Sequence, residues 1–512
     1  MTLKRRLVMI LAVALLAGGL YGTGRLGILV QRDDEEAEVE EDTLFGHRDT
    51  LYLWYTDEAL TDYLNSVVVS YSEYQDDVRV VPVYTSGLEY LETINQASLQ
   101  TEEVPDLYIV SNDSLEKAYL AGLASEVRMP QGALPMEQIL PETAVRAVTY
   151  RDKQMAYPFY FETSCFLYNK TYLEDWARAQ LEAQRDLEIA EESQEQADNG
   201  EVEENASGEE LAADISDEAV AAKIEETLPH TIDDILAFAD VYDAPEQVEA
   251  VFKWDVSDIF YNYFIVGNYI DVGGASGDRS DSIHIYNEEA IRCLRVYQDL
   301  NQFFSIDTKE ISYDGVLQDF MDGKIVYTVA TSDALSRIEK AREEGEFAYE
   351  YGMSMLPDVS EQLRSSSLSV TQCVAVNGYS TQKEMANDFA VYLTQYATAD
   401  LYTRTGKLPV YAGGTTYDNP NAAAFLEEYA NSVPMPKMLE TSNFWVQLEI
   451  AFAKIWTGDD ANDSLKALSE QIMSQILGEA YTEEYIDLPE PVEEEEETVE
   501  AEGSAAEDGG DE

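Results

Sequence analysis

Two short polar segments have residue types and positions suited to holding a small molecule. Asp57 and Glu58 follow an apolar and aromatic run at 51–55, and Asp113 follows a second such run at 107–110. Runs of this length and composition are typical of buried strands. Each segment also precedes an expected helix, whose free N–H groups at the first turn can hold an acceptor. Plain helix capping is the alternative for both segments.

The elements around these segments predict an α/β fold. Apolar and aromatic runs predict strands, and apolar residues at helical spacing predict helices between them. The strands are expected at 51–55, 78–84 and 107–110, and the helices at 60–71, 88–98 and 115–123. Such alternation implies a parallel sheet, in which ligands bind beyond the carboxyl ends of the strands. The two polar segments are therefore expected at one edge of the sheet.

The composition predicts a globular body with charged tails. The chain has 512 residues, with 45% hydrophobic and 11% aromatic residues, which suits two lobes rather than one ordinary domain. The formal net charge is −69, and acidic residues concentrate at 33–42, 174–226 and 487–512. These stretches are poor in aromatics and are expected to be solvated tails and an insertion. Nucleic acid is excluded as a partner because no Lys and Arg cluster is present to contact phosphates.

The N-terminus has the pattern of an export signal or a single membrane-spanning helix. Lys4, Arg5 and Arg6 precede the charge-free run 7–24. We expect an uncleaved anchor over 1–30, with the body outside the cytoplasm and anchored to the cell membrane. Cleavage after Gly24 is the alternative.

Residues for metal binding or catalysis are scarce. The three cysteines, Cys165, Cys293 and Cys373, lie far apart, and we expect buried free thiols. Only three histidines occur, so neither a His-based metal site nor a cofactor is expected. No nucleophile elbow, phosphate loop or dinucleotide fingerprint is present, and we expect a protein that is not an enzyme.

Seven short motifs occur in a characteristic order between residues 51 and 476. They are 51–54 (LYLW), 104–107 (VPDL) with 121–123 (AGL), 156–162 (AYPFYFE), 167–170 (LYNK), 319–324 (DFMDGK), 405–409 (TGKLP) and 443–445 (NFW). In order and spacing the chain resembles the family 1 extracellular solute-binding proteins, the group that includes maltose-binding protein.

The resemblance implies a two-lobed periplasmic-binding-protein-like fold of type II, with α/β lobes and a ligand cleft between them. The expected parts are the anchor (1–30), an acidic linker (31–49), a first lobe (50–160 with 374–430), a second lobe (164–370 with 432–486) containing a disordered acidic insertion (about 177–226), and an acidic tail (487–512).

The resemblance also implies the ligand-binding residues. Glu162 matches a carboxylate that contacts sugar hydroxyls in maltose-binding protein, Asp113 and either Asp57 or Glu58 match other sugar-contacting acids, and Trp254 and Trp445 match aromatic platforms. Carboxylates accept paired hydroxyls, and aromatic rings lie against the C–H faces of a sugar. Core packing is the alternative for both tryptophans, and a hinge carboxylate is the alternative for Glu162.

Two departures from the family pattern leave the ligand open. Val110 stands where maltose-binding protein has a further stacking aromatic, and Ser114 where it has a basic residue. The implied function is capture of a small ligand, a sugar or oligosaccharide, for the permease of an ABC importer. The alternatives are a ligand-sensing subunit for a membrane sensor, a polyamine or cation receptor, and an extracellular carbohydrate-active enzyme.

Overall fold

The computed structural model describes residues 49–100, 104–199, 215–415, 417–439 and 443–489. The expected anchor at 1–30, nearly all of the linker and most of the acidic tail lie outside the described residues. Within the described ranges, no helix is both long and apolar enough to cross a bilayer. Residues from Asp49 onward form one compact unit, to which everything below refers.

Ten strands of the described residues form one mixed sheet. They are β1 (Asp49–Tyr55), β2 (Val78–Tyr84), β3 (Leu107–Ser111), β6 (Tyr157–Asn169), β7 (Ala250–Phe252), β10 (Ile325–Thr331), β11 (Tyr351–Ser354), β12 (Leu368–Val376), β13 (Leu408–Pro409) and β14 (Val433–Pro434). Two small hairpin sheets pair β4 (Thr149–Tyr150) with β5 (Lys153–Gln154) and β8 (Asp271–Val272) with β9 (Ile283–His284).

The first three strands have the expected parallel arrangement. The main order of the sheet is β2-β1-β3-β12-β6-β10-β7, with β1 parallel to both β2 and β3. Their carboxyl ends therefore lie at one edge, which brings Asp57 and Asp113 to the same side. The centre of the sheet is antiparallel, since β12 pairs in that sense with both β3 and β6.

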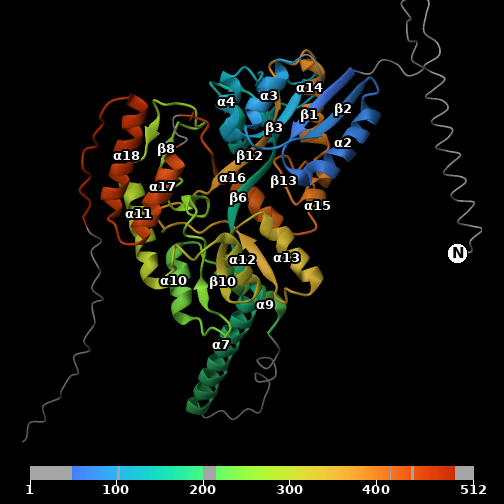
Figure 1. Cartoon of the computed structure of the whole chain (residues 1–512). Coiled ribbons are helices and arrows are strands. Elements are labelled where there is room, and N and C mark those ends of the chain that lie inside the picture. Colours follow the sequence, from blue (N-terminus) through green and yellow to red (C-terminus); the bar gives the residue numbers. More distant parts are fainter. Residues whose placement is uncertain (1–48, 101–103, 200–214, 416, 440–442, 490–512) are drawn as a thin grey trace, which may run out of the picture. The chain divides into compact units, whose positions relative to one another are not determined.

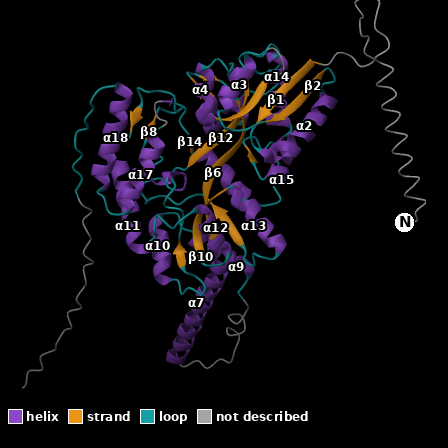
Figure 2. Cartoon of the chain, in the orientation of Figure 1, coloured by secondary structure: helices purple, strands orange, loops and turns teal. Residues whose placement is uncertain are grey.

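Helices flank these strands (Figure 2). The α-helices are α2 (Thr61–Tyr74), α3 (Tyr90–Ser98), α4 (Leu115–Leu120), α5 (Met136–Ile139), α6 (Glu142–Val148), α7 (Lys170–Asn199), α9 (Asp217–Thr227), α10 (Ile232–Val241), α11 (Glu288–Phe304), α12 (Tyr313–Met321), α13 (Asp333–Glu344), α14 (Lys383–Val391), α15 (Leu401–Thr405), α16 (Ala422–Asn431), α17 (Phe444–Trp456) and α18 (Ala461–Leu477). Short 3₁₀ turns are η1 (Glu58–Leu60), η2 (Asn112–Ser114), η3 (Ile259–Tyr261), η4 (Tyr263–Ile265) and η6 (Thr398–Asp400), and η5 (Tyr392–Tyr396) is a π-helical turn.

Strand β6 joins the two halves of the sheet. Its first part, up to Thr163, pairs with β12, and its second part, from Ser164, pairs with β10. Almost every side chain of this 13-residue strand is buried, and Glu162, at the change of partner, is one of two that are partly exposed. A carboxylate at the crossover therefore reaches solvent from an otherwise buried strand.

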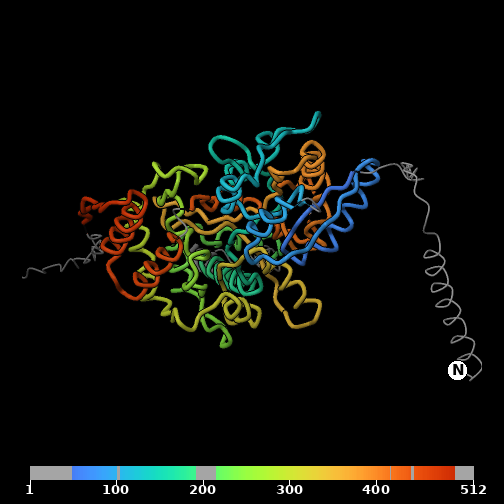
Figure 3. Tube along the Cα trace, turned by 45° about the horizontal axis from the view of Figure 1, so that its top comes forward, coloured from blue at the N-terminus to red at the C-terminus, as the bar shows by residue number. Residues whose placement is uncertain are grey.

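The buried apolar side chains form three clusters. The first core combines 51–160 with 373–401, and the second combines 166–300 with parts of 326–368 and 438–472. Figures 1 and 3 both show α14 and α15 beside the N-terminal strands, although these segments lie far apart in the sequence. A third core holds side chains of α16 and β13 together with those of β10, α12 and α13. The segment 408–429, expected in the first lobe, thus packs against elements expected in the second.

The expectation of a disordered insertion at about 177–226 is corrected at both of its ends. Helix α7 continues to Asn199, and α9 begins after the Ser216 N-cap and buries Val220 and Ile224 in the second core. The physical reason is helix propensity, because this acidic stretch consists largely of Ala, Leu, Glu, Gln and Arg. Figure 1 shows the far end of α7 extending beyond its neighbouring elements. Residues 200–214 lie outside the described part of the chain.

Candidate ligand-binding site

A cavity of about 300 Å³ lies at the crossover of β6, and we call it the central pocket. Glu162 of β6 forms one wall, and Thr405 to Lys407, at the C-terminal end of α15, form a second. The remaining wall comes from the end of β10 and the start of α13, and from two tyrosines, Tyr261 and Tyr313. The pocket therefore joins residues expected in the first lobe to residues expected in the second.

A lysine ties together two of the predicted carboxylates. The Lys407 Nζ lies 3.1 Å from Glu162 Oε1 and 3.3 Å from Asp57 Oδ2, and 5.6 Å from the centre of the Tyr160 ring. Burial acts to lower the Lys407 pKa, but the attraction of Glu162 and Asp57 outweighs it and the pKa is raised. Lys407 therefore stays charged and neutralises part of the acidic charge at the crossover.

The backbone around Lys407 fixes this arrangement. Helix α15 ends at Gly406, which has a φ of 71°, a left-handed conformation that suits glycine. The next residues form β13, in which Leu408 pairs with Phe161 and Pro409 with Tyr160 of β6. Because Lys407 directly precedes this pairing, its side chain is held beside Glu162.

Two stacked tyrosines line another part of the pocket. The rings of Tyr261 and Tyr313 are 4.8 Å apart and inclined by 14°. The Tyr313 hydroxyl donates to Asp333 Oδ1 at 2.7 Å and accepts from the Thr331 amide at 3.3 Å. Burial, and then the Asp333 charge, raise the pKa of Tyr313 above its usual value, so the hydroxyl stays protonated as a donor.

Asp333 in this part of the pocket also forms an ion pair with a basic side chain. Arg337 lies 3.3 Å from Asp333 Oδ2, and its guanidinium is 5.8 Å from the Tyr313 ring centre. The Thr331 hydroxyl also donates to Asp333. The central pocket thus combines aromatic surface with two carboxylates, Glu162 and Asp333, that each contact a basic side chain, which suits a polar, uncharged ligand.

The structure brings together two of the six predicted residues, Glu162 and Asp57. Asp57 also accepts the Ala59 amide at 3.0 Å, so it caps η1 as well as contacting Lys407. Glu58 is exposed within η1. Asp113 accepts hydrogen bonds from Ser111 and Ser114 at the end of β3, outside the lining of the central pocket.

The two tryptophans are placed differently. Trp254 is fully buried, stacks on Phe252 at 4.4 Å and donates from Nε1 to Asn262 at 2.9 Å. Because Phe252 and Trp456 bury its ring, Trp254 has no face open to a ligand in this conformation, and we do not include it among the aromatic platforms. Trp445 is half-buried at the start of α17, with its ring 5.4 Å from that of Tyr263.

Sequence reasoning missed Lys407, Asp333 and the tyrosine pair as site residues. Asp333 stands two residues after β10, the same relation to a strand end that singled out Asp57 and Asp113. The strand-end rule, applied to this later strand, predicts it. Lys407 belongs to the 405–409 motif, but its proximity to Glu162 depends on the pairing of β13 with β6.

The remaining expectations about reactive groups concern cysteines and metals. All three cysteines are free and buried. Among the described residues, no group of three or more His, Cys, Asp or Glu side chains has the geometry to hold a metal ion.

Comparison with known proteins gives one family and a set of similar folds. The model of a family described as bacterial extracellular solute-binding protein matches residues 67–424. An extracellular solute-binding protein from Staphylococcus aureus, solved with maltose, has a TM-score of 0.64 and 18% identity, covering 84% of this chain and 98% of that one.

Two further structures extend the likeness. A cyclo/maltodextrin-binding protein solved with maltotetraose has a TM-score of 0.63 and 18% identity, over 84% of this chain and 97% of that one. A maltose-binding periplasmic protein from Listeria monocytogenes, solved with maltose, has a TM-score of 0.62 and 20% identity, over 85% of this chain and 100% of that one. These likenesses establish the two-lobed fold, and no curated protein matches the chain significantly.

Proposed function

The chain belongs to the family of bacterial extracellular solute-binding proteins, and we propose that it captures a sugar or oligosaccharide in the central pocket for an ABC importer. Family membership implies a location outside the cytoplasm. The observation that carries the proposal is that the Glu162–Lys407 pair and the stacked Tyr261 and Tyr313 line one pocket at the β6 crossover. The maltose and maltotetraose bound to the structural neighbours support a carbohydrate ligand.

The chemistry of the pocket favours a sugar over a polyamine. Glu162 and Asp57 share Lys407, and Asp333 pairs with Arg337. A cationic ligand would have to compete with these resident cations, whereas a sugar hydroxyl can donate to a carboxylate that keeps its ion pair. Tyrosine rings offer a flat surface for the C–H faces of a sugar.

The lobes are proposed with the boundaries given by the resemblance, 50–160 with 374–430 and 164–370 with 432–486. The separate first and second cores support this division up to residue 401, whereas 408–429 packs in the third core against elements of the second lobe. The chain would close on its ligand by bending at the crossovers, of which β6 and β12 are two. Solution scattering should then register a ligand-dependent fall in the radius of gyration.

A thermal-shift screen of the full-length chain against mono- and oligosaccharides and polyamines tests the ligand class. A ligand at a hundred times its dissociation constant stabilises the folded state by about 2.7 kcal/mol, which is readily measured. We expect a sugar to give a shift that Glu162→Ala removes and Glu58→Ala, a matched acidic control exposed in η1, keeps. A polyamine shift that Glu162→Ala removes would favour the cation-receptor alternative instead.

We expect the protein neither to hydrolyse its ligand nor to act mainly as the ligand-sensing subunit of a membrane sensor. Incubation with oligosaccharides should leave them intact, and hydrolysis products would support a carbohydrate-active enzyme. Cells lacking the protein should lose uptake of the ligand. Normal uptake with a lost transcriptional response would point to the sensor alternative.

We propose that the N-terminus anchors the protein to the membrane, on the basis of the charge-free run 7–24 behind Lys4, Arg5 and Arg6. Mass analysis of protein extracted from membranes should find this segment attached. A mature chain beginning at Arg25 in the soluble fraction would contradict the anchor.

A further inference from the structure

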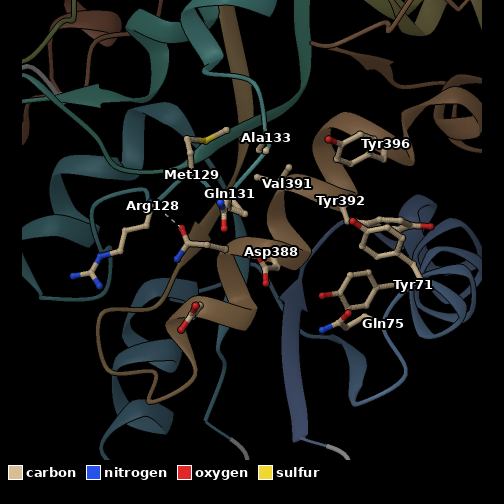
Figure 4. Close-up of a pocket in the computed structure, with 15 residues that line it drawn as sticks. Tyr71, Gln75, Arg128, Met129, Gln131, Ala133, Asp388, Val391, Tyr392 and Tyr396 are labelled. Carbon is tan, nitrogen blue, oxygen red and sulfur yellow. Dashed lines mark hydrogen bonds between the residues drawn. The ribbon is translucent and has the colours of Figure 1, made fainter.

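A second and larger cavity, of about 750 Å³, lies beside the first core and shares no residue with the central pocket. We call it the tyrosine pocket. It is lined by the C-terminal end of α2, the loop 128–133, and α14 with the π-helical turn η5 (Figure 4). Helix α2 begins at Thr61, four residues after Asp57, which contacts Lys407 of the central pocket. The 14 residues of this helix span about 20 Å, and the tyrosine pocket lies at its other end.

Four tyrosines build the aromatic side of this pocket. Tyr71 and Tyr74 come from α2, and Tyr392 and Tyr396 from η5. The Tyr392 ring lies 5.0 Å from that of Tyr71, 5.4 Å from that of Tyr74 and 6.5 Å from that of Tyr396. Tyr74 and Tyr396 are 71% and 62% exposed, so aromatic surface is open to a ligand. Such π-helical turns are frequent at functional sites.

Two carboxylates one helical turn apart line the same pocket, and neither forms an ion pair with a described residue. Glu384 and Asp388 stand four residues apart on α14. Burial, and then the neighbouring Glu384 charge, raise the pKa of Asp388. The basic residue in the lining is Arg128, and Figure 4 shows its side chain pointing away from Tyr71 and Tyr392.

The charge of Asp388 interacts with Tyr71, one of the four tyrosines of the pocket. It raises the pKa of Tyr71, second only to the effect of burial. Glu73 adds further negative charge, since it acts on Tyr392 in the same direction. Negative charge from Asp388 and Glu73 therefore acts on a cluster of tyrosine rings.

We propose that the tyrosine pocket is a second binding site, for an organic ammonium ion. A positively charged nitrogen bearing carbon substituents is attracted to the faces of aromatic rings and to carboxylates, and its alkyl groups bury against the same rings. A small inorganic cation lacks the apolar surface to use the tyrosines, and a neutral sugar would leave Glu384 and Asp388 uncompensated. The inference goes beyond the proposed function, because it uses none of the central-pocket residues.

Titration calorimetry of the full-length chain with choline, at fixed ionic strength, tests this site. The neutral isostere 3,3-dimethylbutanol is the matched ligand control. We expect choline to bind, the isostere to bind at least tenfold more weakly, and Asp388→Asn to weaken choline at least tenfold. Tyr392→Leu should weaken choline independently, and Glu162→Ala should leave it unchanged.

Several results would overturn the proposal. They are equal binding of the isostere, displacement of choline by potassium at matched concentration, unchanged choline affinity in Asp388→Asn, and binding of maltotetraose in place of choline. The sugar-induced thermal shift should survive in Asp388→Asn, which shows that this variant is folded and separates failure of this site from failure of the central pocket.

Discussion

The central pocket and the tyrosine pocket use the same residue types, carboxylates and tyrosines, but differ in their cations. In the central pocket Lys407 lies within 3.3 Å of both Asp57 and Glu162, and Arg337 pairs with Asp333. In the tyrosine pocket, burial and Glu384 raise the pKa of Asp388, and neither carboxylate forms an ion pair with a described residue. Residue type alone therefore does not determine the ligand class, because the balance of charge decides between a neutral and a cationic ligand.

Removing Lys407 from the central pocket should cause the largest change in ligand affinity. Lys407→Met leaves Asp57 and Glu162 as adjacent unpaired acids, and we expect sugar affinity to fall by about 2 to 3 kcal/mol. The same variant should gain affinity for organic ammonium ions at this pocket. Calorimetry with sugar and with choline measures both changes.

The matched control is Lys153→Met, which removes a surface ion pair with Glu126. Exposed pairs contribute little, and we expect both affinities to stay unchanged. Retained sugar affinity in Lys407→Met would show that the ion pairs of the central pocket are not part of the site.

Acidification should weaken the tyrosine pocket selectively. Because the folded-state pKa of Asp388 is raised, its charge is lost as the pH falls at a higher pH than for an ordinary aspartate. Choline affinity should then fall by up to tenfold per pH unit below that pKa, or about 1.4 kcal/mol. The titratable groups that interact with Asp388 are Glu384, Tyr71 and Tyr157, and the side chain of Arg128 points away from Tyr71.

A pH series with Asp388→Asn separates this effect from general acid unfolding. The variant should bind choline weakly with a flatter profile, while the wild type loses affinity in the acidic range. Parallel profiles for the two proteins would assign the pH dependence to another group.

Removing the Tyr313 hydroxyl from the central pocket should lower sugar affinity by a smaller amount. Tyr313→Phe keeps the stacked ring but removes the bond donated to Asp333, and we expect a loss of about 1 kcal/mol in sugar affinity. Tyr351→Phe, which removes a bond to Glu339 outside the central pocket, is the control. An equal loss in both variants would indicate a general effect on stability.

The smallest effect is expected at the exposed edge of the tyrosine pocket. Tyr396→Leu removes one ring that is 62% exposed, and cation–π contacts at exposed sites contribute about 0.5 to 1 kcal/mol. Choline affinity should fall by this amount and sugar affinity should not change. A loss as large as that of Asp388→Asn would mean that aromatic contact, not charge, dominates binding.

Much of the first half of the fold could be predicted because its signals are local. The strand at 78–84 and the helix around 60–71 follow from runs and spacing within a few residues, and β2 and α2 occupy these positions. Asp57 was found by the strand-end rule, which needs no knowledge of the later chain. The same rule applied to β10 also identifies Asp333.

The rest of the site depends on contacts between distant segments. Lys407 meets Glu162 through β13 pairing with β6, and the tyrosine pocket joins 71–74 to 392–396. Trp254 is core because Phe252 and Trp456 cover it, which its local sequence does not reveal. Helix α7 was missed because charge was weighed above helix propensity.

The central claim, that the solute binds at the β6 crossover, is tested most directly by Glu162→Ala. The variant leaves ligand hydroxyls without their acceptor, and calorimetry with the best sugar of the screen should record a loss of about 2 to 3 kcal/mol. Its unfolding should remain cooperative, since the Glu162 side chain is 44% exposed. Sugar affinity equal to that of the wild type and of Glu58→Ala would contradict the account and move the binding site away from the central pocket.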